Sequence, residues 1–170
     1  MRGTIVILLF LAPFLGGCRL VGTPPPAPPS PATTPNRPDP AASEGERIAA
    51  GVVDTALQAL GTPYRWGGTA SNGFDCSGLI QYAYAQHGID LPRRSQDQLG
   101  AGRPVETRLG ALQPADILGF AETAGGKSSH VGLYVGGGDF IHSSSTGVRL
   151  SELTDPFWQV RLLSARRIVR

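Results

Sequence analysis

The sequence predicts an α+β fold for the part of the chain that follows residue 46. About 120 residues remain there, which is enough for one compact domain with a single core. The 23 glycines and the single methionine favour a loop-rich α+β domain over a helical bundle. Two segments with helical periodicity come first and segments with strand patterning follow. We therefore expect one domain over residues 47–170.

The N-terminal segment, residues 1–17, has the pattern of a signal peptide. After Arg2, the stretch from Ile5 to Leu15 is apolar apart from Pro13. This run of about eleven residues suits a signal h-region and is shorter than the roughly 20 residues that span a bilayer. We expect it to direct export.

Residues 15–18 (LGGC) resemble the lipobox of bacterial lipoproteins. The resemblance implies cleavage before Cys18, acylation of its thiol, and a membrane anchor made of lipid. Arg19 follows, where an aspartate tends to retain lipoproteins in the inner membrane, so the implied location is the outer membrane, facing the periplasm. The alternative is a secreted protein with a Cys18–Cys76 disulfide, although that bridge would close a long loop without cross-linking parts of a hydrophobic core.

Residues 18–46 form a linker in this prediction, because proline recurs at nearly every second position between Thr23 and Pro40. Such a segment favours extended polyproline II and would hold the domain roughly 50 Å from its anchor. A proline-rich ligand for a partner domain is the alternative.

The domain is expected to open with a helix that ends near Gly61 and Pro63. Its apolar face is formed by residues at helical spacing, namely Ile48, Val52, Val53, Ala56, Leu57 and Leu60. Residues 62–68 (TPYRWGG) then form a loop, because the proline and the paired glycines disfavour regular structure.

A second helix is expected to begin after Asp75, which suits the N-cap position, and to close at Gly88. Leu79, Ile80, Ala83, Tyr84 and His87 mark its buried side. His87 is interpreted as a residue of the helix end and not as a ligand.

Cys76 falls at the first helical position and is the best candidate nucleophile, because no other thiol of the chain lacks an assigned role. The unpaired N–H groups and the positive end of the helix dipole favour its thiolate. We therefore expect a thiol pKa below the ordinary value of about 8.5. The same N–H groups can hold an oxyanion.

Downstream, residues 115–120 read as a short strand, and residues 129–135 and 139–143 read as a hairpin around Gly136–Gly138. If the loop is odd in length or contains a bulge, His130 and His142 share one face of that hairpin. Gly132 lies between them, where it would allow a helix end to come close. A thiol and two imidazoles are the groups that nucleophilic catalysis requires.

The charge of the chain is mildly basic, with a formal net charge of +2 and a pI near 8.8. This is too weak to indicate nucleic-acid binding. The C-terminal arginines, among them Arg161, Arg166 and Arg167, are interpreted as the solvated side of a last strand.

Five ordered motifs resemble those of the NlpC/p-sixty family of bacterial cell-wall cysteine peptidases. They are residues 63–68 (PYRWGG), 74–79 (FDCSGL), 91–95 (LPRRS), 130–136 (HVGLYVG) and 140–142 (FIH). The resemblance covers nearly the whole domain from about Ile48. It implies a papain-like α+β fold in which a helix carrying the cysteine packs on an antiparallel sheet carrying the histidines.

The resemblance also implies roles by position. Cys76 would be the nucleophile, His130 the base and His142 the orienting third member, and the enzyme would hydrolyse peptidoglycan stem peptides. Apart from the resemblance, we expect a monomer without a cofactor or metal. Tyr64 would lie by the oxyanion site, and Asp75 and Ser95 would bind the stem peptide. Ala115 departs from the family pattern, which usually has glycine before the aspartate.

Three alternatives stay open at this point. Cys76, His130 and His142 could be three ligands of a zinc site, although the close ligand pair typical of such sites is absent. The thiol could serve a Cys-dependent acyltransferase of the same fold. The domain could also be an inactive wall-binding lipoprotein.

Overall fold

The structure is a computed structural model that describes residues 42–169. The predicted signal peptide, Cys18 and most of the linker lie outside the described residues. Within residues 42–169, the helices are too short or too polar to cross a membrane.

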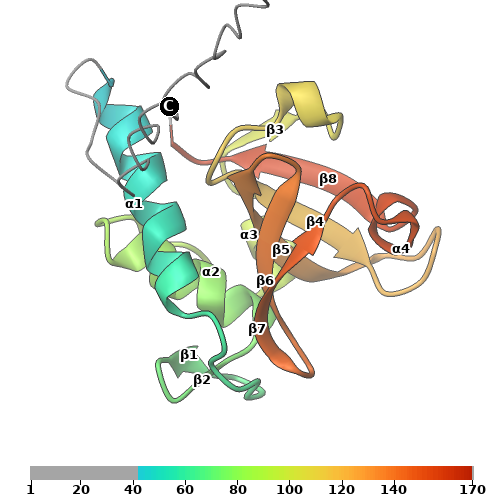
Figure 1. The fold of residues 1–170 in the computed structure, drawn as a ribbon, viewed down its shortest axis with the longest axis horizontal. Coiled ribbons are helices and arrows are strands. Elements are labelled where there is room, and N and C mark those ends of the chain that lie inside the picture. Colours follow the sequence, from blue (N-terminus) through green and yellow to red (C-terminus); the bar gives the residue numbers. More distant parts are fainter. Residues whose placement is uncertain (1–41, 170) are drawn as a thin grey trace, which may run out of the picture. The chain divides into compact units, whose positions relative to one another are not determined.

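The described residues form an α+β fold with helices beside an antiparallel sheet, as predicted (Figure 1). The helices are α1 (Glu44–Gln58), α2 (Cys76–Ala85), α3 (Ser95–Gln98) and α4 (Pro156–Gln159), with a 3-10 turn at Leu109–Ala111. The strands of the main sheet are β3 (Arg103–Val105), β4 (Ile117–Ala121), β5 (Ser128–Gly136), β6 (Asp139–Ser144), β7 (Gly147–Glu152) and β8 (Leu162–Arg167). Their order across the sheet is β3-β8-β4-β5-β6-β7, and β1 (Thr69–Ala70) pairs with β2 (Gly73–Phe74) in a separate ribbon.

Helix α1 begins at Glu44, inside the segment that the sequence analysis assigned to the linker. A capping box sets this start: the Ser43 hydroxyl accepts from the Glu46 N–H, and the Glu46 carboxylate accepts from the Ser43 N–H. The helix ends at Gln58, three residues before Gly61. Leu60, predicted on the apolar face, lies beyond the helix and is exposed.

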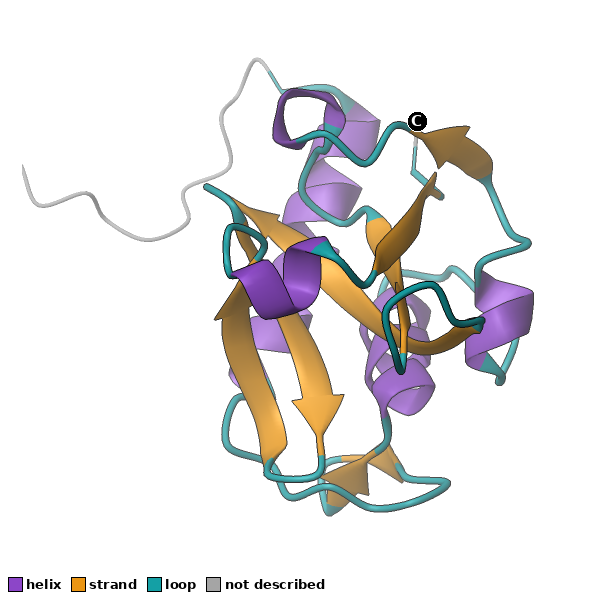
Figure 2. Ribbon diagram, turned by 90° about the vertical axis from the view of Figure 1, so that its right-hand side faces the viewer, coloured by secondary structure: helices purple, strands orange, loops and turns teal. Residues whose placement is uncertain are grey.

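Helices α1 and α2 lie side by side on one face of the main sheet (Figures 1 and 2). Gly51 allows this approach, because a Cβ there would stand 2.4 Å from the His87 ring. The His87 Nε2 lies 3.0 Å from the Thr55 hydroxyl. His87 therefore has a packing role between the helices, two residues beyond the end of α2.

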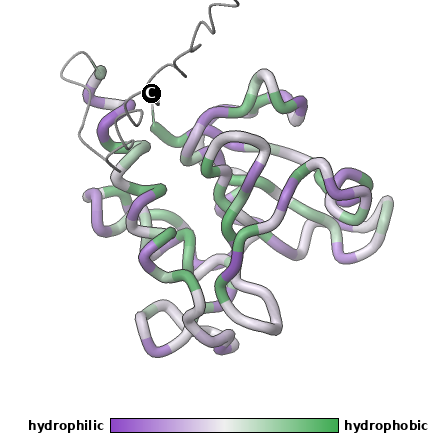
Figure 3. Tube along the Cα trace, in the orientation of Figure 1, coloured by the Kyte–Doolittle hydropathy of each residue, from purple (hydrophilic) through white to green (hydrophobic). Residues whose placement is uncertain are grey.

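Two hydrophobic clusters lie on opposite faces of the sheet, because alternate residues of each strand point to opposite sides. The first joins the helices to the sheet through residues such as Val52, Leu79, Val131, Leu133 and Ile141. The second lies on the other face and includes Leu118, Phe120, Tyr134, Phe140 and Ala165. Figure 3 shows hydrophobic stretches along the helices and the central strands.

The β5–β6 hairpin is present, and its register confirms the predicted shared face of the two histidines. Leu133 pairs with Ile141, and a bulge lies between Tyr134 and Gly136. The bulge adds one residue to β5. This extra residue puts His130 and His142 on the same face, which a loop of even length would otherwise have prevented. The predicted role of Gly132 was wrong: a Cβ there would stand 2.6 Å from the Phe140 ring, so this glycine makes room for a neighbouring strand and not for a helix end.

The interpretation of the C-terminal arginines as a solvated face was wrong for Arg167. Its guanidinium forms two hydrogen bonds with the fully buried carboxylate of Asp116, at 2.7 and 2.6 Å, and the Arg167 side chain is 11% exposed. A buried carboxylate needs such a partner, and the pairing of β8 with β4 brings Arg167 to Asp116, the residue just before β4.

Ala115, the residue before Asp116, has a φ of 70°. It is the one non-glycine residue with positive φ among residues 42–169, which explains why glycine suits this position.

Candidate active site

Cys76 is the first residue of α2, as predicted, and its N-cap is Asp75. The Asp75 Oδ1 accepts from the Gly78 N–H at 2.7 Å. The N–H groups of Cys76 and Ser77 find no backbone or side-chain acceptor within the described residues other than the thiol itself. These two donors therefore remain at the helix start beside the sulfur, where an oxyanion would develop.

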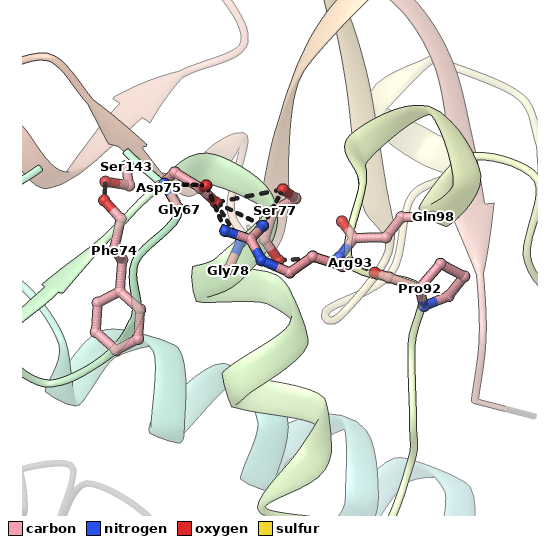
Figure 4. Close-up of polar contacts among 9 residues, drawn as sticks. All are labelled: Gly67, Phe74, Asp75, Ser77, Gly78, Pro92, Arg93, Gln98 and Ser143. Atoms are coloured by element: carbon pink, nitrogen blue, oxygen red, sulfur yellow. Dashed lines mark hydrogen bonds and ion pairs between the residues drawn. The ribbon is translucent and has the colours of Figure 1, made fainter. Parts of the chain in front are cut away.

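The Asp75 carboxylate is held by donors from three directions (Figure 4). Its Oδ2 accepts from the Gly67 N–H at 3.0 Å and from Arg93 at 2.5 Å, and Arg93 also contacts the Ser77 hydroxyl at 2.8 Å. Burial acts to raise the pKa of the Asp75 carboxyl, but the hydrogen bonds from Arg93 and Gly78 outweigh it, so the pKa lies below its usual range. The carboxylate is thus ionised, and its hydrogen bonds hold the start of α2 in place.

The loop before Cys76 is packed directly against the first turn of α2. A Cβ on Gly78 would stand 1.9 Å from the Gly68 carbonyl oxygen. That same oxygen accepts from the Asp75 N–H at 3.1 Å. Only glycine at position 78 permits this backbone approach, and the approach fixes the loop that carries Tyr64.

Four of the predicted site residues line one open cavity of about 1230 Å³. These are Tyr64, Cys76, His130 and His142. Asp75 and Ser95 do not line it: Asp75 lies behind Cys76 in the network with Arg93, and Ser95 begins α3. Their predicted role in substrate binding stays a prediction.

The two histidines form a hydrogen-bonded pair within this cavity. His130 Nε2 lies 2.8 Å from His142 Nδ1, and the rings meet edge to face with centroids 5.0 Å apart. Burial lowers the pKa of His130 to about 4. Burial, with the nearby His130 and Arg149, lowers the pKa of His142 to about 3. Both rings are therefore neutral near pH 7, and His130 is in the protonation state of a base.

Two residues of this site were missed by the sequence analysis. Ser151 on β7 places its hydroxyl 3.0 Å from His142 Nε2. Trp158 on α4 packs its ring against both imidazoles, with centroids 4.9 Å from His142 and 6.0 Å from His130. Trp158 thus shields the imidazole pair on one side. Ser151 follows His142 by nine residues on the next strand, and Trp158 lies farther on in α4, so the alternation within one strand did not indicate them.

The expected lowering of the thiol pKa was wrong. Burial raises the pKa of the Cys76 thiol above its ordinary value, and the Asp75 carboxylate adds to this. The N–H groups of Val131, Ser77 and Cys76 act in the opposite direction but are outweighed. No hydrogen bond joins Cys76 to His130 in the described part of the chain, so no thiolate–imidazolium pair offsets the burial. The contact with Val131, the neighbour of His130, shows that the sulfur faces β5.

A metal site at these residues finds no support in their geometry. Among residues 42–169, no group of three or more His, Cys, Asp or Glu side chains is arranged to hold a metal ion. The Nε2 and Nδ1 atoms that face each other in the histidine pair are engaged in one hydrogen bond, and Cys76 is a free thiol.

Comparison with known proteins gives concordant matches over this domain. The family model described as "NlpC/P60 family" matches residues 61–167. The chain is 40% identical over 119 residues to the bifunctional muramidase/DL-endopeptidase CwlT of Bacillus subtilis, covering 69% of this chain and 36% of that one. It is 39% identical over 121 residues to the murein DD-endopeptidase MepH of Escherichia coli, covering 69% of this chain and 45% of that one.

The solved structures that resemble this chain include an NlpC/P60 family protein from Bacillus cereus. The two share 37% identity with a TM-score of 0.67, over 72% of this chain and 40% of that one. The chain spans between a quarter and about half the length of the curated relatives it matches.

Proposed function

The chain belongs to the NlpC/P60 family, and from that premise we propose that it is a cysteine endopeptidase that hydrolyses amide bonds in the stem peptides of peptidoglycan. The observation that carries the proposal is the His130–His142 pair at 2.8 Å in the wall of the cavity that also contains Cys76. The relatives named as a murein DD-endopeptidase and a bifunctional muramidase/DL-endopeptidase support the substrate class.

The proposed reaction begins with a thiol and a neutral imidazole. His130 takes the thiol proton as Cys76 Sγ attacks the amide carbonyl, and the tetrahedral oxyanion forms beside the N–H groups of Cys76 and Ser77. The Tyr64 hydroxyl, which lines the same cavity, is a further donor for this oxygen. His130 then gives its proton to the leaving amine, and a thioester remains on Cys76.

Hydrolysis of the thioester completes the cycle. His130 takes a proton from water as the water attacks the acyl carbon, and the proton returns to sulfur as the thiol leaves. The products are a free carboxylic acid and a free amine. His142 holds the His130 ring through its Nδ1 throughout.

Digestion of defined muropeptides with mass spectrometric detection tests this proposal. Cleavage at the D-glutamyl–diaminopimelate bond or at the D,D-crosslink is expected, and it should be absent with the Cys76→Ala variant. Appearance of a transferred acyl group in place of a new carboxylic acid would favour the acyltransferase alternative. Binding without cleavage by the wild type would favour an inactive wall-binding protein.

The N-terminal segment extends the proposal to location. We propose that residues 1–17 are removed, that Cys18 is acylated, and that the proline-rich linker holds the domain 47–170 away from the membrane, with the outer membrane as the site of anchoring. Two or more acyl chains on one cysteine are sufficient for stable attachment. Cys18→Ser should release the protein from the membrane fraction, whereas Cys76→Ser should leave it there.

A further inference from the structure

Ser151 is hydrogen-bonded to Nε2 of His142, the ring nitrogen of that histidine that does not contact His130. Its Oγ lies 3.0 Å from His142 Nε2, and within residues 42–169 it is the sole hydrogen-bond partner of that nitrogen. Ser151 lies on β7 opposite Phe140 of β6, half-buried in the cavity wall. The three side chains thus form a line from Ser151 through His142 to His130.

The protonation of this line has two possible arrangements, because a neutral imidazole carries a single N–H. If His142 carries its proton on Nδ1, it donates to His130 Nε2, and the His130 proton must then sit on Nδ1. If His142 carries its proton on Nε2, it accepts at Nδ1 from the His130 Nε2–H. Only the second arrangement leaves His130 Nδ1 free to accept the thiol proton.

We propose that Ser151 is a positioning residue that selects the second arrangement by accepting a hydrogen bond from the His142 Nε2–H. A serine hydroxyl has two lone pairs and can accept this bond while its own hydrogen points elsewhere. Without the hydroxyl, a buried Nε2–H would lack an acceptor. His142 would then favour the tautomer protonated on Nδ1, in which it donates a hydrogen bond to His130 Nε2. The proposal rests on the proposed function, because His130 must act as a base for the arrangement to matter.

The test compares Ser151→Ala with Ser151→Thr, which keeps the hydroxyl, and with Ser164→Ala as a control. Ser164 is also half-buried on a strand of the same sheet, but it does not line the cavity. Side-chain ¹⁵N NMR of the histidines reports which nitrogen carries the proton, and it requires no substrate. Muropeptide hydrolysis gives kcat and KM for the same proteins.

We expect wild-type His142 and His130 both to be protonated on Nε2. Ser151→Ala should shift both protons toward Nδ1 and lower kcat about tenfold, with KM changed less than about twofold. Ser151→Thr should restore the wild-type protonation and most of kcat, and Ser164→Ala should change neither readout.

Two results would overturn the inference: a wild-type His142 protonated on Nδ1, or unchanged protonation of both rings in Ser151→Ala. If wild-type protein leaves every muropeptide intact while the NMR signals shift in Ser151→Ala as expected, the proposed function fails and the role of Ser151 in positioning the proton stands.

Discussion

The Ser143 hydroxyl donates a 2.7 Å hydrogen bond to the Phe74 carbonyl oxygen, and both residues are buried. Ser143 follows His142 on β6, and Phe74 precedes the N-cap residue of the helix that carries Cys76 (Figure 4). One hydrogen bond therefore joins the strand that carries His142 to the segment that leads into Cys76.

Ser143→Ala should loosen this connection. The Phe74 carbonyl keeps the Arg65 N–H as a second donor, so we expect a loss of about 1 kcal/mol in the free energy of unfolding and not a larger penalty. We expect kcat to fall severalfold because the thiol and the imidazole pair lose part of their alignment. Denaturant unfolding and muropeptide kinetics measure the two effects. Unchanged kcat together with lowered stability would show that the bond is structural only.

Substitutions in the proposed triad should separate its roles. Cys76→Ala and His130→Ala should each lower hydrolysis on the order of 10³-fold or more, because one removes the nucleophile and the other removes the base. His142→Ala should lower the rate less and leave measurable activity. His142→Asn and His142→Gln should retain more than His142→Ala, because each can still form one hydrogen bond with His130. A fully active His142→Ala would rule out the orienting role.

The pH dependence of thiol alkylation tests the direction of the Cys76 pKa. Because burial raises it, iodoacetamide labelling of the free enzyme should have its midpoint above the ordinary thiol value of about 8.5. His130→Ala should leave that midpoint nearly in place. A midpoint well below pH 8 that is lost in His130→Ala would instead reveal a thiolate–imidazolium pair. The denatured protein provides the reference midpoint.

Ala115 adopts a left-handed backbone conformation that costs an L-residue about 1–2 kcal/mol. Ala115→Gly removes this strain at the cost of one buried methyl, about 0.8 kcal/mol, so we expect a net gain of roughly 0.5 kcal/mol in the free energy of unfolding. Ala115→Val should lose about 2 kcal/mol, because a β-branched side chain at positive φ is more strained. Chemical denaturation of the three proteins should give free energies of unfolding that decrease in the order Gly, Ala, Val at position 115. Equal stability of the three would show that the backbone relaxes without cost.

The buried imidazoles should make the domain sensitive to acid. The pKa values of His130 and His142 are about 4 and about 3 in the folded state, against about 6.5 in the unfolded chain. Below pH 6.5 the unfolded chain binds protons that the folded state excludes, so stability is lost as the pH falls from about 6.5 toward 3. Thermal unfolding of wild type and His142→Asn between pH 7 and 4 tests this. His142→Asn should lose less stability over that range, and parallel curves for the two proteins would contradict it.

The elements that are encoded by local patterns were predictable from the sequence. Asp75 signals a helix start by residue type, and alternation predicts the two strands that carry His130 and His142, whereas the bulge that puts both histidines on one face remained a condition of the prediction. The start of α1 at Glu44 could also have been found, because Ser43 and Glu46 form a recognisable capping box.

The remaining features depend on tertiary contacts that local residue patterns do not encode. Arg167 lies in a basic C-terminal segment, and only the pairing of β8 with β4 brings it to Asp116. Ser151 reaches His142 for the same reason, through the pairing of β7 with β6. The pKa of Cys76 depends on how deeply the sheet buries the helix start, and no spacing of residues encodes that depth.

The backbone contact between Gly68 and Gly78 has a consequence for engineering this scaffold. The loop and the first turn of α2 touch with no space for a side chain, and Asp75 bonds to the backbone of both. The loop and this turn therefore depend on each other: a designer who exchanges the loop for that of another protein must exchange the turn that carries Cys76 with it.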